Sequence, residues 1–446
     1  MYRKRRNRLF ATPHRQRWKL FPLALLACSF PGFAQQSHDP AAVLLSVRDR
    51  LLPELERLPR YTCVQTITRR YFRPEPYVLT PSCAKLIAAH DKRKHELTLL
   101  KWDRLRMEVA IADGQNVYSW VGAPRFEEGA LEKLAGNGPL GSGDFGPFIG
   151  AILRKAEVSF RETQAAQKNP LLLYAYQMPL SRSSYRIKGD QGWMLTGYSG
   201  TLLLDPVDSD IVTLKIRSDE LQENKTVCQA SSEIDYTRVA IHDRTILIPR
   251  ETRLGIIDAK GSESLSTTEY SNCREYASKT RLLFEAPQDH PATPATQNSA
   301  APGQLPAGLH FQGRIATPID SDTAAAGDPI DIVLVKPLRD ANGLIAPAGT
   351  LIHARLKRVE QWPAGYTQVT LQFETMELNG TAIPLRARAD LAPLAMSRGA
   401  GSLLVSRDPA SLDTTTLTFR GEHLHFRQFE WGWTTLPLDA KDDKSF

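Results

Sequence analysis

Residues 103–111, Asp-Arg-Leu-Arg-Met-Glu-Val-Ala-Ile, alternate between two kinds of side chain. Positions 105, 107, 109 and 111 hold large apolar residues, whereas positions 104, 106 and 108 hold charged ones. Successive side chains of a β-strand point to opposite faces, so this period of two predicts a strand with one buried and one solvated face. The stretch therefore indicates an antiparallel sheet.

Similar patterns extend outward from this stretch through most of the chain. Runs rich in β-branched and aromatic residues are separated by Gly, Pro, Asp and Asn, which are the residues that turns favour. These runs predict strands at 61–72, 116–120, 171–178, 183–188, 193–204, 210–217, 232–240, 245–254, 265–275 and 279–284. The sequence thus predicts a mainly β (α+β) fold, with a curved antiparallel sheet and few helices.

Two helices are expected among these strands. Asp39 is a candidate N-cap, and Pro40 suits the first helical position. Apolar residues then recur at spacings of three and four from Leu44 to Leu58, which predicts a helix with one buried face. A second helix is expected near residues 145–156.

Residues 286–307 separate two predicted domains. This segment is rich in Pro, Ala, Thr and Gln and has almost no large apolar side chains, which is typical of a disordered linker. It divides an antiparallel sheet domain at 40–285 from a second domain at 308–438, where Asn379-Gly380 is a hairpin signal. Strands of the second domain are expected at 330–335, 351–359, 368–378 and 381–388. A small β-barrel or sandwich suits this pattern.

The N-terminus has the features of an export signal. Residues 1–34 contain eight Arg and Lys residues and no acidic residue, and they include an apolar run of 11 residues, Leu20–Phe30. This run is too short for a membrane-spanning helix, which needs roughly 20 residues. The small residues Gly32 and Ala34 then predict cleavage of a signal peptide between Ala34 and Gln35.

A second interpretation of the same leader remains open. Leu25-Leu26-Ala27-Cys28 resembles a lipobox, in which Cys28 would be lipidated and would become the mature N-terminus. Either outcome predicts an exported protein, in the periplasm or associated with the outer membrane. No later stretch has the length of a transmembrane segment, so none is expected in the mature chain.

The leader also accounts for the positive charge of the chain. The formal net charge is +7, and the eight basic residues of positions 1–34 leave 7 − 8 = −1 for the remainder. A basic mature protein would have suggested nucleic acid as a partner. We therefore expect no nucleic-acid partner, and the sequence does not indicate an oligomeric state.

Four cysteines would remain after the leader: Cys63, Cys83, Cys228 and Cys273. An even number suits disulfide formation in an oxidising compartment. The pairs Cys63–Cys83 and Cys228–Cys273 close the shortest loops and are favoured here, with four buried thiols as the alternative.

Sequence motifs for catalysis, cofactors or metals are weak. Residues 136–141 match G-x-G-x-x-G formally but do not follow a strand within a βαβ unit. His353, His423 and His425 could bind a metal only if their side chains converged, and solvated strand histidines are commoner. No catalytic residue, cofactor or metal site is predicted.

Aromatic residues are numerous between positions 61 and 198. One interpretation is that they fill the core. The other is that some of them line a concave groove between a curved sheet and its helices, where an apolar ligand could lie. They are Tyr61, Tyr71, Phe72, Trp102, Tyr118, Trp120, Tyr174, Tyr176, Trp193 and Tyr198.

Several strings resemble a family of uncharacterised exported proteins of Gram-negative bacteria. They are Leu58-Pro59-Arg60-Tyr61-Thr62-Cys63-Val64-Gln65-Thr66-Ile67, Gly141-Ser142-Gly143-Asp144-Phe145, Ile234-Asp235-Tyr236-Thr237-Arg238-Val239 running to Leu247-Ile248-Pro249, and Cys273-Arg274-Glu275-Tyr276. The resemblance covers residues 40–285 and implies no established activity. The order of elements there is similar to the LolA/LolB-like lipoprotein-carrier architecture.

The second predicted domain resembles the β-barrel module of TrbI-like secretion-channel components. The strings are Ile319-Asp320-Ser321-Asp322, Gly327-Asp328 and Gly343-Leu344-Ile345, followed by Pro347-Ala348-Gly349-Thr350. The membrane-crossing segments of those channel proteins have no counterpart here, so the resemblance implies a general envelope-binding module.

These observations predict a non-catalytic binding or scaffolding protein of the cell envelope. Its concave sheet would take a lipid, a lipoprotein or a peptide, or would contact another envelope protein. The alternative is a hydrolase-like periplasmic enzyme with a site assembled from distant residues.

Overall fold

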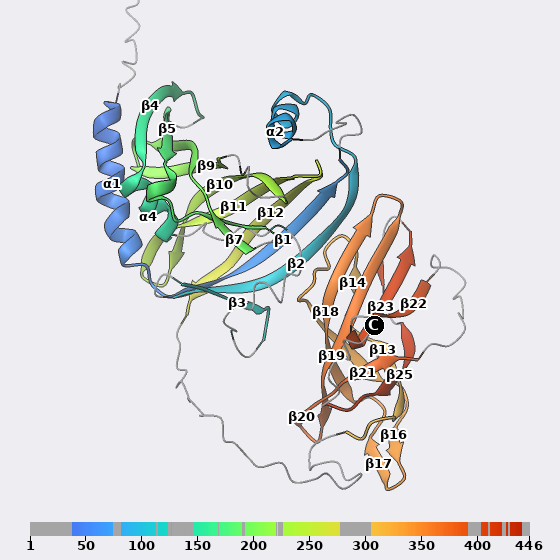
Figure 1. Cartoon of the computed structure of the whole chain (residues 1–446). Coiled ribbons are helices and arrows are strands. Elements are labelled where there is room, and N and C mark those ends of the chain that lie inside the picture. The colour runs from blue at the N-terminus through green and yellow to red at the C-terminus, as the bar shows by residue number, and fades with distance from the viewer. Residues whose placement is uncertain are drawn as a thin grey trace, which may run out of the picture. The chain divides into compact units, whose positions relative to one another are not determined.

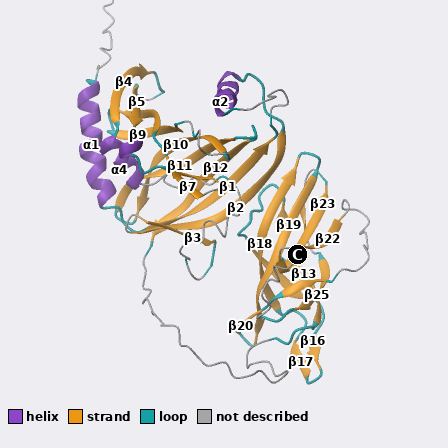
Figure 2. Cartoon of the chain, viewed as in Figure 1, coloured by secondary structure: helices purple, strands orange, loops and turns teal. Residues whose placement is uncertain are grey.

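The computed structural model confirms a mainly β fold with three α-helices in the part of the chain that it describes (Figure 2). The helices are α1 (Pro40–Glu56), α2 (Cys83–Lys92) and α4 (Gly146–Lys155). The described residues are 38–74, 82–112, 115–123, 126, 139, 146–167, 169–189, 192–219, 221, 226–276, 305–390, 403–408, 411–421, 425–426 and 429–438.

Strands of the first half of the chain form a continuous antiparallel row (Figure 1). In spatial order they are β4 (Glu157–Gln164), β5 (Leu171–Met178), β8 (Tyr198–Asp205), β9 (Asp210–Ser218), β10 (Val227–Ile241), β11 (Arg244–Asp258), β12 (Glu263–Glu275), β1 (Tyr61–Phe72), β2 (Leu99–Ala112) and β3 (Gln115–Trp120). A separate hairpin joins β6 (Arg186–Gly189) to β7 (Gly192–Leu195), and a 3₁₀ turn, η1, spans Leu180–Arg182. The half-buried strand expected at 103–111 is the central part of β2.

Helix α1 begins as its sequence predicts. The side chain of Asp39 accepts a hydrogen bond from the backbone N of Ala41, at 3.1 Å. Val43, Val47 and Leu51 are buried against α4 and β9, so the apolar face of the helix packs on the sheet. The helix ends at Glu56, inside the predicted range.

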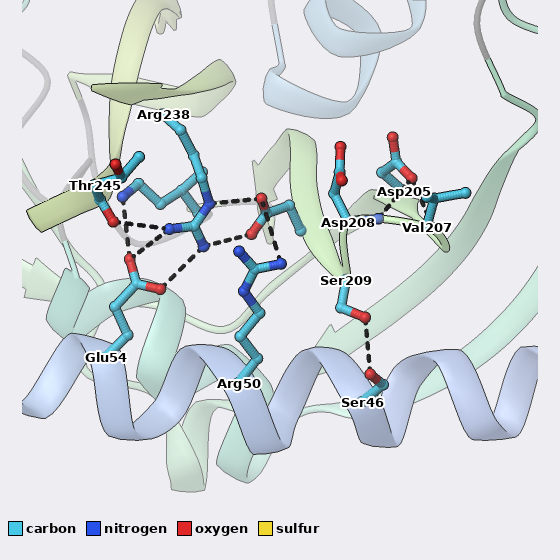
Figure 3. A network of polar contacts seen from close by, with 11 residues as sticks. Ser46, Arg50, Glu54, Asp205, Val207, Asp208, Ser209, Arg238 and Thr245 are labelled. Atoms are coloured by element: carbon cyan, nitrogen blue, oxygen red, sulfur yellow. Dashed lines mark hydrogen bonds and ion pairs between the residues drawn. The ribbon is translucent and has the colours of Figure 1, made fainter. Parts of the chain in front are cut away.

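A charged network also holds α1 on the sheet (Figure 3). Arg238 of β10 donates to both carboxylate oxygens of Glu54 in α1, at 3.1 and 2.9 Å, and to both of Asp210 in β9, at 2.7 Å each. Hydrogen bonds to Asp210 are the main cause that raises the pKa of Arg238. The hydroxyl groups of Ser46 and Ser209 add a contact of 2.8 Å. Polar contacts therefore join α1, β9 and β10 in addition to the apolar core.

Helix α2 is an element that the sequence pattern did not predict. Ser82 caps it by accepting from the backbone N of Lys85 at 3.4 Å, and only Leu86 of the helix is fully buried. Its packed apolar residues Cys83, Leu86 and Ile87 span little more than one turn, which is too short a run to predict a helix from the sequence. A disulfide from Cys83 and an ion pair of Arg93 with Glu263 fasten its two ends.

The second half of the chain forms another antiparallel row around one core. Its order is β21 (Ala387–Ala389), β25 (Glu430–Thr435), β13 (His310–Ile315), β15 (Pro329–Leu334), β18 (Leu351–Trp362), β19 (Tyr366–Leu378), β23 (Ser411–Arg420) and β22 (Leu403–Asp408), with β20 (Thr381–Pro384) also paired to β19. Short pairs are β14 (Ile319–Asp320) with β24 (His425–Phe426), and β16 (Leu338–Asp340) with β17 (Gly343–Ala346). The backbone N of Ala389 in β21 donates to Thr415 of β23, so the row folds back on itself.

Residues 39–446 form one compact unit in which these two rows touch along β2. The backbone N of Arg106 donates to the O of Ala326 at 2.7 Å, and the N of Ala326 donates to the O of Arg104 at 2.8 Å. The side chain of Arg106 also pairs with Asp328 at 2.5 Å. The boundary at 286–307 lies outside the described residues except for 305–307, and the division into two domains stays a prediction.

Candidate functional site

The face of the first sheet that α1 and α4 cover is called the inner face here (Figure 1). Where the helices cover it, on β5, β8, β9 and β10, it is filled by a close-packed core. Tyr174, Tyr176 and Tyr198 belong to this core, and burial raises the pKa of Tyr174 and of Tyr198 to about 12. At these three positions the aromatic residues fill the core and do not line an open groove.

The β6–β7 hairpin packs on the same face farther along the sheet. Ile187 of β6 and Met194 of β7 contact a core cluster that contains Ala230 of β10 and Leu254 of β11. The hairpin thus covers β10 and β11 beside the helix-covered part.

Beyond the hairpin, the inner face of β12 and β1 carries polar side chains. Thr268 is paired with Ile67, and Ser266 is paired with Arg69, so Gln65, two residues before Ile67, shares their face. Gln65, Ser266 and Thr268 are only 3%, 1% and 6% exposed. We call these three residues the polar strip.

One hydroxyl of the polar strip lacks a hydrogen-bond partner. The Oγ atom of Ser266 is buried and makes no hydrogen bond to any residue that the structure describes. Burying a hydroxyl without a partner costs about 1–3 kcal/mol, and most buried polar groups in proteins are therefore satisfied by protein, water or ligand. A face that combines such a group with the buried polar side chains of Gln65 and Thr268 is a candidate binding site.

A charged pair closes one end of the polar strip. Arg69 of β1 donates from Nε and Nη2 to the two oxygens of Asp103 in β2, at 2.7 Å each, and Tyr71 adds a long contact of 3.4 Å to Asp103. Burial alone would lower the pKa of Arg69, but its hydrogen bonds to Asp103 raise the pKa overall. The charges at this end are satisfied by each other, whereas the hydroxyl of Ser266 is not.

The chemistry of the polar strip is that of recognition. Serine and threonine hydroxyls and a glutamine amide both donate and accept hydrogen bonds. The strip would therefore suit a ligand with both kinds of group, such as an amide or a hydroxyl. It is flanked by apolar Ile67, Leu105 and Met107 on the same face.

The four predicted disulfide cysteines are all bonded, but the favoured pairing is wrong. The bonds are Cys63–Cys273 and Cys83–Cys228. Cys63 lies in β1 and Cys273 in the neighbouring β12, while α2 carries Cys83 against β10, which carries Cys228. Short loop length is a poor guide here because the strand order brings distant parts of the chain together.

Other predicted positions can be located only in part. Cys28, Ala34 and Gln35 lie outside the described residues, as do His423 and all of residues 136–141 except Pro139. His353 does not meet another histidine in any described contact. Its Nδ1 lies 2.9 Å from Asp331, and its Nε2 lies 3.1 Å from Glu377. Within the described ranges, no group of three or more His, Cys, Asp or Glu side chains is placed to hold a metal ion.

One Thr–His–Asp group bears on the enzyme alternative. Thr434 and Asp390 both contact Nδ1 of His310, at 3.0 and 3.4 Å, and Thr434 donates to Asp390 at 2.5 Å. A catalytic triad needs the acid on one ring nitrogen and the nucleophile on the other. This group lacks that arrangement, and the His310 side chain is 75% exposed.

The polar strip was not found from the sequence, although a signal for it exists. In the predicted strand 61–72, the buried phase that contains Tyr61, Cys63 and Ile67 also contains Gln65 and Arg69. Polar residues in phase with the apolar face of a strand mark a place where the core is not purely apolar.

Comparison with protein-family models and with curated protein sequences finds no match. Among solved structures, a DUF1329 family protein from Desulfovibrio piger aligns with a TM-score of 0.26 and 9% sequence identity, over 55% of this chain and 96% of that one. So low a score carries no argument about function. The similarities to LolA/LolB-like and TrbI-like architectures stay predictions.

Proposed function

We propose that this protein is an exported, non-catalytic binding protein of the cell envelope, and that its polar strip receives a peptide-like ligand. The observation that carries the proposal is the buried, unpartnered Oγ atom of Ser266, on the same face as Gln65 and Thr268. A ligand that supplies hydrogen bonds there would recover the free energy that burial of these groups costs.

A peptide fits the polar strip better than an acyl chain does. An acyl chain would leave the buried Oγ atom of Ser266 without a partner, because hydrocarbon neither donates nor accepts hydrogen bonds. A peptide offers an N–H and a C=O at almost every residue. Its side chains would meet the apolar neighbours Ile67 and Met107.

Export is proposed from the leader and is compatible with the two disulfides. None of the helices in the described ranges combines the length and the apolar character that a bilayer span requires. Whether the mature chain begins at Gln35 or carries a lipid on Cys28 is tested by the mass of its N-terminal peptide after digestion.

The binding proposal is tested by Thr268→Val, with Thr416→Val as the matched control. Both threonines lie in strands and are 6% exposed, but Thr416 shares a hydrogen bond of 2.9 Å with Thr370. Thr416→Val should lower the free energy of unfolding by about 1 kcal/mol, since it leaves Thr370 unpaired. Thr268→Val should leave stability equal or higher while it weakens ligand binding.

The readouts are chemical denaturation of the ligand-free protein and the amount of peptide that copurifies from the periplasmic fraction. Equal destabilisation by both variants would mean that Thr268 is satisfied within the fold. Unchanged peptide content in a stable Thr268→Val protein would remove Thr268 from the ligand contacts. Either result would overturn the role of the polar strip.

A further inference from the structure

The outer side of the β6–β7 hairpin exposes two cations and two large apolar side chains together. Arg186 is paired with Leu195, and Lys188 is paired with Trp193, so all four residues share the side of the hairpin that faces away from the core. All four are exposed, Trp193 by 54% and Leu195 by 47%. We call these four residues the hairpin surface.

The opposite side of the same hairpin is fixed to the sheet. Ile187 is 6% exposed and packs with Leu254 in the core cluster on β10 and β11. Successive side chains of a strand point to opposite sides, so Arg186 and Lys188, the neighbours of Ile187 in β6, point away from the sheet. Because the inner side is anchored, the exposure of the hairpin surface is a fixed property of the fold.

Trp193 is far more exposed than the core aromatic residues of this half of the chain. Tyr61, Tyr174 and Tyr198 are at most 1% exposed, whereas more than half of Trp193 is open to solvent. Lys188 places its Nζ 5.9 Å from the centroid of the Trp193 ring. The apolar ring and the cation thus form one surface feature.

We infer that the hairpin surface docks on an anionic lipid bilayer. Tryptophan is enriched at membrane interfaces, where its ring has both an apolar body and a polar N–H. Lysine and arginine can bury their stems while their charged groups reach lipid phosphates. The described residues of the hairpin surface carry charge of one sign, which complements an anionic headgroup layer.

This inference does not rest on the proposed function. The hairpin surface faces away from the sheet, whereas the polar strip lies on the inner face of β12 and β1. Peripheral docking by a surface this small is weak, because durable membrane attachment generally needs two anchors. A lipid on Cys28, if present, would supply the other one.

Vesicle co-sedimentation tests the inference with the full chain purified from the periplasmic fraction. Cys28→Ser removes any lipid contribution at that position. Binding is expected to vesicles of phosphatidylglycerol and phosphatidylcholine but not to phosphatidylcholine alone, and it should fall as salt rises. The double variant Arg186→Gln/Lys188→Gln should lower the partition coefficient roughly 25-fold, since each cation contributes about fivefold.

Trp193→Ser/Leu195→Ser tests the apolar half of the hairpin surface and should lower the partition coefficient at least as much. The matched control is Arg339→Gln/Leu344→Ser in the β16–β17 hairpin, where an exposed arginine is also paired with an exposed leucine. This control should bind vesicles like the unaltered chain. Circular dichroism and thermal unfolding of each variant verify that the fold is intact.

Three outcomes would overturn the inference. The first is no binding of the unaltered chain to anionic vesicles. The second is binding that the hairpin variants and the control reduce equally. The third is a dimer in sedimentation equilibrium that Trp193→Ser/Leu195→Ser dissociates, because the hairpin surface would then be an interface between two copies of the chain.

Discussion

Arg69 and Asp103 face each other across the β1–β2 pairing and are joined by two hydrogen bonds of 2.7 Å. Their side chains are only 7% and 9% exposed. Each charge is therefore buried next to its counter-charge at the end of the polar strip. Such a pair costs desolvation when it forms, and it costs more when one partner is removed.

Asp103→Asn should lower the free energy of unfolding by about 3–5 kcal/mol, because Arg69 would remain buried without the carboxylate that now accepts two of its hydrogen bonds. The double variant Arg69→Leu/Asp103→Leu removes both charges and should be clearly more stable than Asp103→Asn alone. Urea denaturation of the three proteins measures this difference. A double variant no more stable than Asp103→Asn would contradict the explanation that the loss comes from leaving the charge of Arg69 buried without Asp103.

The disulfides predict a specific peptide map. Digestion without reduction should release peptides that join Cys63 to Cys273 and Cys83 to Cys228. Replacing one pair with serines should cost about 2–4 kcal/mol, since each bond closes a long loop and restricts the unfolded chain. Peptides that join Cys63 to Cys83 would contradict the strand order described here.

His353 predicts a pH dependence of stability. Burial alone would lower its pKa, but the hydrogen bonds that the ring donates to Glu377 and Asp331 raise the pKa above the ordinary 6.5. A group whose pKa is raised on folding stabilises the protein fully below its unfolded pKa, and this stabilisation is lost as pH rises through the folded pKa.

The melting temperature should therefore fall more for the unaltered chain than for His353→Gln when the pH rises from about 6 to about 8.5. This range spans the ordinary pKa of histidine. Differential scanning calorimetry at several pH values gives the comparison. Parallel curves for the two proteins would mean that His353 has the same pKa in the folded and unfolded chain.

The two rows of strands approach each other closely at Gly327, and substitution of this residue tests that approach. Its φ is +103°, and a Cβ there would overlap the backbone O of Arg106 and the ring of Trp120. Gly380 has a φ of +76° and open space around it. Gly380→Ala should cost about 1–2 kcal/mol from backbone strain, and Gly327→Ala about 1–3 kcal/mol more from the overlap. Equal losses in thermal unfolding would contradict the close approach.

Local patterns in the sequence predicted much of the first sheet. Strand β5 occupies residues 171–178 as expected, and Asp39 caps α1 through its side chain. Asn379 and Gly380 both have positive φ, at 50° and 76°, which is what a tight two-residue hairpin turn needs. These features depend on neighbouring residues alone, so a single sequence is enough to find them.

The remaining features depend on contacts between distant residues. The pairing of Cys63 with Cys273 follows from β1 lying beside β12, which no local pattern encodes. The range 193–204, expected as one strand, is divided into β7 and β8, because β7 turns back to pair with β6. The polar strip likewise exists only because β1 and β12 are neighbours.

The most direct test of the polar strip is native mass spectrometry of the protein extracted from the envelope without denaturation. The unaltered chain should carry an added mass that fragments as a peptide. The variant Ser266→Ala/Thr268→Val should lose this mass, and its free energy of unfolding should be no lower than that of the unaltered chain. An unaltered chain without such a mass, together with a double variant destabilised as Thr416→Val is, would show that Ser266 and Thr268 are ordinary core residues.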